Sequence, residues 1–190
     1  WKKKVGNNWN TPSGHDIIWR SRSKEAMPLL AEMIKSSDAV GMLWSFRAFD
    51  FHKDPSKQAV LSKLVTETQG EKVLYALKHM DASNTTLTPA VRTALNKTLD
   101  QYKDRLEFVE LASRFKLINK TNDLLSISLH YPDSVMGKEA MKTLLDWNQS
   151  ERIQKVVSQK KKEEEAKQKA EQERQDRELY LRLKKKFENA

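Results

Sequence analysis

Four histidines are the residues that acid–base or metal chemistry would use first in this 190-residue chain. Each lies in a different expected element, and no HExxH or HxH spacing joins two of them. They are His15, His52, His79 and His130. A metal site would have to assemble entirely in space, so we expect surface or helix-end histidines and no metal ligand.

Two short stretches bring a carboxylate close to an imidazole along the chain. Ser13, His15 and Asp16 are near neighbours, and Asp50 stands two residues before His52. A catalytic triad needs three groups that meet across a fold, which neighbours in sequence do not provide. We therefore expect no catalytic residue, and we interpret residues 50–52 as a helix end docked on the core.

Most of the Trp and Phe side chains fall within the first 51 residues, interleaved with arginines. The set comprises Trp9, Trp19, Trp44, Phe46, Phe49, Phe51, Arg20, Arg22 and Arg47. Such a mixture suits stacking on bases and binding of phosphates, as in single-stranded nucleic-acid binding. It also suits a structural role, which we favour because the aromatics occupy core positions of the helical pattern. On that interpretation Trp44 and Phe49 are buried.

On the same interpretation, the arginines are expected to stabilise the fold. Arg47 and Asp50, with Arg20 or Arg22 nearby, are expected to form a charge-assisted network. This network would hold the segment from Trp9 to Trp19 on the first helix pair.

Composition excludes several kinds of site. The chain has no Cys, which excludes disulfides, thiolate metal sites and CxxCH haem attachment within these residues. Five glycines without GxGxxG or P-loop spacing exclude the usual phosphate-binding loops. No run approaches the ~18 apolar residues of a membrane span. The net charge of +9 is dispersed, which favours loose affinity for anionic surfaces without sequence readout. We expect no cofactor here.

The elements that must position these residues are predicted to be all α-helical. Apolar periodicity gives helices over 24–35, 39–51, 56–68, 71–80, 89–102, 105–117, 124–130 and 134–147. Pro28 should set the first start between Glu25 and Met27, while Asp38, Thr88 and 121–123 should act as caps. Residues 1–23 are turn-rich and are predicted to form an N-terminal loop, and 81–88 a polar loop.

The helices are short and follow one another in consecutive pairs. Two pairs are offset by about 32 residues, near the period of stacked helical repeats. This spacing favours antiparallel helix pairs in a HEAT-like α-solenoid over 24–149. An irregular helical domain is the alternative.

Residues 150–190 are predicted to form a charged arm. Residues 160–178 hold seven basic and seven acidic groups, and Ala is their only apolar type. This pattern favours a solvated helix supported by i,i+4 pairs, or a disordered arm. A coiled coil is excluded because apolar a and d positions are missing. The tip residues Leu179, Tyr180, Leu183 and Phe187 suit a helix-in-groove docking element, or a helix that folds back on its own domain.

Two stretches carry a family resemblance: residues 9–22 followed by 24–30, and Arg47-Ala48-Phe49-Asp50-Phe51-His52. They resemble the helical middle region of large exported bacterial proteins described as membrane-bound dehydrogenases or haem-binding CxxCH proteins. The resemblance implies a HEAT-like segment between a β-propeller and a cytochrome c domain, in the periplasm or cell envelope. Haem c and any oxidoreductase site would then belong to the parent protein, because this chain has neither CxxCH nor propeller strands.

Three functions follow from these observations. The favoured one is a non-catalytic scaffold or protein-interaction module, partnered by proteins or by neighbouring domains of its parent. Because Trp1 is no initiator residue, we expect a segment or a processed product. The alternative is a basic helical protein that binds nucleic acid or another polyanion, without sequence specificity. The third is an enzyme with a pocket that sequence does not reveal.

Overall fold

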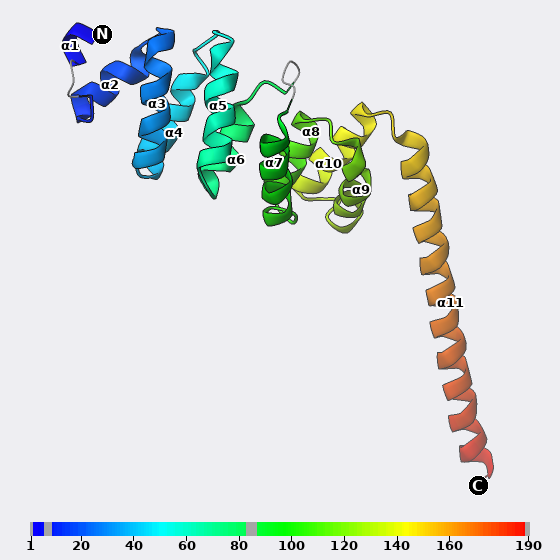
Figure 1. The fold of residues 1–190 in the computed structure, drawn as a ribbon. Coiled ribbons are helices and arrows are strands. Elements are labelled where there is room, and N and C mark those ends of the chain that lie inside the picture. Colours follow the sequence, from blue (N-terminus) through cyan, green and yellow to red (C-terminus); the bar gives the residue numbers. More distant parts are fainter. Residues whose placement is uncertain (1, 6–8, 83–86, 189–190) are drawn as a thin grey trace. The chain divides into compact units, whose positions relative to one another are not determined.

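The computed structural model describes residues 2–5, 9–82 and 87–188 (Figure 1). Within these ranges it has eleven α-helices, two short 3-10 turns and no strand. The helices are α1 (Lys2–Val5), α2 (Pro12–Arg20), α3 (Met27–Ser36), α4 (Ala39–Phe49), α5 (Ser56–Glu67), α6 (Glu71–His79), α7 (Pro89–Gln101), α8 (Leu106–Arg114), α9 (Thr121–His130), α10 (Val135–Asp146) and α11 (Ser150–Glu188). The predicted all-α class is confirmed for this part of the chain. Within the predicted polar loop 81–88, residues 83–86 lie outside the described residues.

Capping residues set where several helices begin. Oxygens of the Thr11, Asp38 and Thr88 side chains accept hydrogen bonds from backbone N–H groups three residues ahead, at 3.1, 2.8 and 3.3 Å. Each cap satisfies one of the free N–H groups of a first helical turn. Helix α3 begins at Met27 with Pro28 in its first turn, inside the range that the sequence predicted.

The prediction of a loop over residues 1–23 is wrong, because 12–20 form helix α2. Thr11 caps this helix and Ile18 is completely buried, so a cap and a core contact outweigh the weak local propensity. Glycine favours turns, yet this helix requires it at position 14. A Cβ atom at this position would overlap the backbone oxygen of Trp9.

The predicted start of α9 also needs correction. Residues 121–123 were expected to cap this helix, but they form its first turn. Thr121 is buried, and its hydroxyl donates a hydrogen bond to the carbonyl of Ile118 at 2.6 Å. Tertiary burial of the hydroxyl therefore replaced the capping role that an exposed threonine would have taken.

The chain forms two compact units, Trp1–Ala140 and Met141–Ala190, and the boundary between them falls inside α10. In unit 1, α3 packs on α4 and α5 on α6, and these pairs also contact each other through α3 with α5 and α4 with α6. The order continues with α7 against α5 and α6, then α8 against α6 and α7. Gly70 turns the chain between α5 and α6 at a φ of 62°, a conformation that glycine adopts readily.

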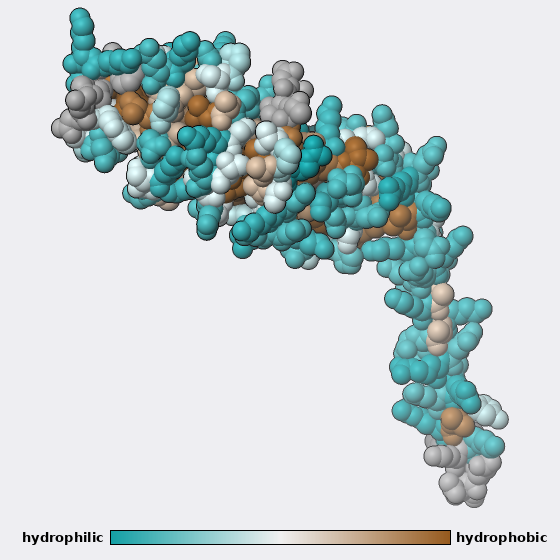
Figure 2. Space-filling view, viewed as in Figure 1, coloured by the Kyte–Doolittle hydropathy of each residue, from teal (hydrophilic) through white to brown (hydrophobic). Residues whose placement is uncertain are grey.

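The core of unit 1 consists of apolar side chains from most of its helices. The largest fully buried ones are Ile18, Met27, Leu30, Met33, Ile34, Phe46, Phe49, Leu61, Leu64, Leu77, Met80 and Phe108. On the face that Figure 2 shows, hydrophobic patches appear between hydrophilic residues. Two long cations link neighbouring helices, because Lys72 donates to the carbonyl of Lys35 at 2.5 Å and Arg114 to that of Met80 at 3.2 Å. They satisfy carbonyls near the ends of α3 and α6.

Unit 2 contains α11, which begins at Ser150, where the composition changes. The structure favours the helical form of the arm over the disordered one, and Figure 2 shows hydrophilic residues along most of it. Ion pairs one helical turn apart support it, with Lys161 Nζ 3.9 Å from Glu165 and Arg174 Nη2 2.8 Å from Glu171. No helix in the described residues is both long and apolar enough to cross a membrane.

A truncation after Gln159 should leave the melting temperature of unit 1 unchanged to within a few degrees. Side chains from 161 to 182 are all exposed, so their removal costs no buried apolar area. Circular dichroism of the 190-residue and truncated chains measures this. A large drop in melting temperature would show that the arm packs on its own domain.

Candidate interaction surface on helices α2 and α4

Helix α4 carries apolar residues on all sides, but only one side enters the core. Met42, Ser45, Phe46 and Phe49 are buried. The opposite face exposes Val40, Leu43, Trp44 and, in the turn after the helix, Phe51. The prediction that Phe49 is buried is confirmed, whereas the prediction for Trp44 is wrong, since 48% of Trp44 is exposed. Periodicity does not select a face when a helix is apolar all round.

Helix α2 lies against α4 through one hydrogen bond and one ring contact. The indole Nε1 of Trp19 donates to Ser45 Oγ at 3.0 Å, and the Ser45 hydroxyl donates in turn to the carbonyl of Gly41 at 2.8 Å. The Trp19 and Trp44 rings meet at a tilt, with 6.0 Å between their centroids. Trp19 therefore fixes α2 beside the exposed face of α4.

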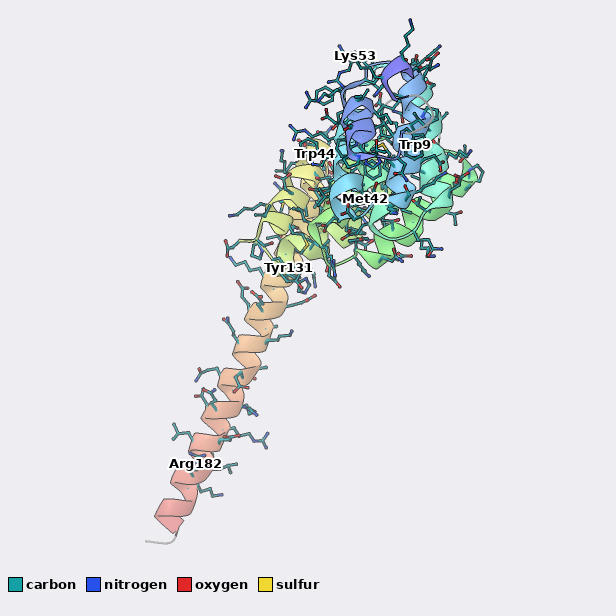
Figure 3. All side chains as sticks on the ribbon, turned by 90° about the vertical axis from the view of Figure 1, so that its left-hand side faces the viewer. Trp9, Met42, Trp44, Lys53, Tyr131 and Arg182 are labelled. Carbon is teal, nitrogen blue, oxygen red and sulfur yellow. The ribbon has the colours of Figure 1, made fainter. Side chains whose placement is uncertain are left out.

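The ring contact extends into a row of four aromatic side chains. His15 lies between Trp9 and Trp19, with ring centroids 6.3 and 5.7 Å apart, and the row ends at Trp44. The Nε2 atom of His15 is 3.0 Å from Asn10 Oδ1. Figure 3 labels the first and last members of this row, Trp9 and Trp44, and also Met42 of helix α4. Trp9 and Trp19, both singled out from the sequence, are thus part of one surface.

A groove of about 460 Å³ opens beside this row. We call it the arginine–aromatic groove. It is lined by Asp16, Trp19, Arg20, Arg22, Trp44, Arg47, Ala48 and Phe51. The guanidinium of Arg22 lies 4.3 Å from the Phe51 ring centroid, and that of Arg47 lies 5.4 Å from the Trp44 centroid. Arg20 is paired with Asp16, its Nε 2.9 Å from Oδ1.

The predicted network between Arg47 and Asp50 is wrong. Asp50 Oδ1 lies 2.7 Å from His79 Nδ1 and 4.0 Å from Lys57 Nζ, so this carboxylate faces α5 and α6. Arg47 points instead to the Trp44 ring. The N-terminal segment contacts α4 through the indole–hydroxyl hydrogen bond of Trp19, whereas its Arg20–Asp16 pair lies within α2. Asp50 follows the last residue of α4, and its carboxylate contacts α5 and α6 rather than Arg47.

Asp16 and Phe51 also belong to this surface. The sequence grouped Phe51 with the aromatics and arginines, but its exposed position was not predicted. A signal for Phe51 was present, because Trp44, Arg47 and Phe51 follow each other at helical spacing. Phe51 was instead interpreted as part of a helix end docked on the core. It is 51% exposed, while His52 beside it is buried.

His52 lies beneath this end of α4, only 4% exposed, with no hydrogen-bond partner for Nε2 in the described part of the chain. Burial lowers the pKa of His52, the positive charges of Arg22 and Lys57 lower it further, and Asp54 opposes them. The unfolded chain therefore binds the proton at higher pH than the folded chain does. Stability contributed by neutral His52 is complete above the ordinary pKa of about 6.5 and is lost as pH falls through the folded value.

We expect the urea midpoint of unfolding to fall between about pH 7 and pH 5, and to fall less steeply in His52→Leu. The change of the urea midpoint with pH is compared between the variants, because His52→Leu also alters packing and so shifts the midpoint at every pH. His130→Ala, at an exposed position, is the control and should keep the wild-type slope. Equal slopes for His52→Leu and wild type would contradict the assignment to His52.

The described residues contain no group of three His, Asp or Glu side chains that would hold a metal ion. The neighbours Ser13, His15 and Asp16 do not assemble into a triad, since His15 contacts Asn10 and Asp16 pairs with Arg20. At the arm's tip, Leu179 and Tyr180 are 57% and 64% exposed. The side chains of Leu183 and Phe187 lie outside the described residues, so docking through the tip stays a prediction.

Comparisons with models of protein families, with curated protein sequences and with solved structures find no match for this chain. The resemblance carried by residues 9–30 and 47–52 therefore stays a prediction. The arginine–aromatic groove rests on the geometry alone, and both helices that form it belong to unit 1.

Proposed function

We propose that this chain is a non-catalytic helical scaffold that binds a protein partner through the exposed face of α4. In this proposal the helices of unit 1 form antiparallel pairs stacked as in HEAT-like solenoids. The order of contacts supports this arrangement, because α3 packs on α4, α5 on α6, and each pair on the next. Stacked pairs leave helix faces free along a row, and such faces commonly serve as binding surfaces.

The observation that supports the proposal most directly is the exposure of apolar side chains on α4 and in the turn after it. Val40, Leu43, Trp44 and Phe51 are between 44% and 62% exposed and lie beside the arginine–aromatic groove. Contiguous apolar surface with a charged border is typical of protein–protein interfaces, and Trp and Arg are enriched at their energetic centres. A face of this kind would be costly to leave in water without a partner.

The resemblance adds a proposed context. The chain would be the spacer of a larger exported bacterial protein of dehydrogenase or cytochrome type, located in the periplasm or cell envelope. Haem c and substrate chemistry would belong to other domains of that protein. Residues 9–30 and 47–52 support this context, and sequencing the parent reading frame tests it directly.

A photo-crosslinking amino acid at Leu43, in the full chain expressed in its native source, tests the interaction. We expect one discrete protein adduct that is lost when Trp44→Ala is added. The same crosslinker at Thr93, exposed on α7, is the control and should not give that adduct. No adduct, or the same adducts from both positions, would contradict the proposal. A nuclease-sensitive adduct would favour the polyanion-binding alternative.

A further inference from the structure

The arginines of the groove are arranged to recognise an anion. A guanidinium that lies over an aromatic ring keeps its N–H donors at its edge, where they point away from the ring. Arg22 is placed in this way over Phe51, and Arg47 over Trp44. Stacking also limits the rotation of these side chains, so less entropy is lost when they bind.

The charges in the groove are unbalanced. Arg20, Arg22 and Arg47 line it together with a single carboxylate, Asp16, which pairs with Arg20. Within the described part of the chain, Arg22 Nη1 makes only long hydrogen bonds, 3.3 and 3.4 Å, to backbone carbonyls. Arg47 has no carboxylate partner in the described ranges. Two guanidiniums are therefore available, and a complementary partner carries negative charge.

The same groove offers apolar area next to those donors. Trp44 and Phe51 are about half exposed, and Val40 and Leu43 continue the apolar surface along α4. The volume of about 460 Å³ is within the range of about 300–1,000 Å³ for pockets that bind ligands. A partner segment with carboxylates and one bulky apolar side chain would satisfy both parts of the surface.

We infer that the arginine–aromatic groove binds an acidic peptide segment of a partner protein. This inference rests on the interaction role proposed above. Carboxylates of the segment pair with Arg22 and Arg47, and an apolar side chain packs beside Trp44. Carboxylates fit the edge of a guanidinium in a bidentate manner.

Single-stranded nucleic acid suits this groove less well. Its affinity depends on bases that stack on open aromatic faces. Here guanidiniums lie over Phe51 and Trp44, and the Trp44 ring also contacts Trp19. The arginine edges remain available to anions while a guanidinium already covers one face of each ring, which favours carboxylates beside an apolar side chain.

The test is fluorescence anisotropy with the full 190-residue chain and a labelled peptide of alternating Glu and Ser around one Phe. We expect saturable binding, weakened about tenfold by Arg47→Gln and by Arg22→Gln, since each removes a charge-assisted hydrogen bond. Arg92→Gln removes the same charge from an exposed position on α7 and should leave the affinity unchanged. Arg47→Lys keeps the charge but loses the bidentate geometry, and should weaken binding severalfold.

Two further probes separate the possible outcomes. A peptide with Gln in place of Glu should not bind, and oligo(dT) should bind more weakly than the acidic peptide. No binding of the acidic peptide, equal losses for Arg47→Gln and Arg92→Gln, or tighter binding of oligo(dT) would overturn the inference. If it fails while the Leu43 crosslink gives its Trp44-dependent protein adduct, the interaction role stands with another partner chemistry. Circular dichroism of each variant confirms folding, which these exposed positions should not disturb.

Discussion

Replacing Phe49 with alanine should lower the free energy of unfolding of unit 1 by about 3–5 kcal/mol. Phe49 ends helix α4, is completely buried and lies against His52, with 6.3 Å between ring centroids. Truncation removes most of its buried apolar area and leaves a cavity that a helical core fills only in part. Urea denaturation followed by circular dichroism measures the loss, and a cost below about 1 kcal/mol would contradict this core assignment.

Phe51→Ala is the matched control, two residues along the chain. The Phe51 side chain is 51% exposed, and its ring contacts the Arg22 guanidinium. We expect a cost of at most about 1 kcal/mol, because little buried area is lost and an exposed cation–π contact is weak. Equal costs for the two phenylalanines would contradict the assignment of Phe49 to the core and of Phe51 to the surface.

Replacing Gly137 with alanine should destabilise unit 1 by about 1–3 kcal/mol. Gly137 lies in the first turn of α10, where a Cβ atom would overlap the backbone carbonyl of Tyr131. A backbone carbonyl moves less easily than a side chain, so the 131–134 turn must shift. The turn is held by hydrogen bonds from the Ser134 hydroxyl to the Tyr131 carbonyl and from Gly137 N–H to Ser134 Oγ, at 2.9 and 3.0 Å.

Thermal unfolding of Gly137→Ala beside Lys138→Ala isolates this steric effect. Lys138 is the next residue of α10 and is exposed, so its truncation should be nearly neutral in a helix. Alanine is ordinarily a better helix former than glycine, so a stabilised Gly137→Ala variant would show that the close approach to Tyr131 does not exist.

Local signals in the sequence were sufficient for most helix positions. Asp38 and Thr88 accept the capping hydrogen bonds that their types predicted, and Pro28 lies in the first turn of its helix. The change of composition at Ser150 coincides with the start of α11. These features depend on hydrogen bonds and backbone angles within a few residues, so a linear sequence contains the necessary information.

Where local signals in the sequence conflicted with tertiary packing, the prediction of secondary structure was wrong. Residues 12–20 have turn-forming composition, yet they are helical because Ile18 is buried and the carbonyl of Trp9 comes close to Gly14. The burial of Ile18 depends on helices distant in sequence, so it is not visible in a window of a few residues. The helix depends on what it packs against more than on its propensity.

The sequence by itself determined that this chain is helical, lacks cysteine chemistry and concentrates tryptophan and phenylalanine near its N-terminus. Only the tertiary structure decided which of those aromatics face water. Helix α4 is apolar all round, and the helices it packs on, α2, α3 and α6, bury Phe46 and Phe49 and leave Trp44 half exposed. The same packing turned Asp50 to His79 and left Arg47 on the Trp44 ring. Helices distant in sequence determine which face of α4 is buried. The periodicity of a helix that is apolar all round does not identify that face.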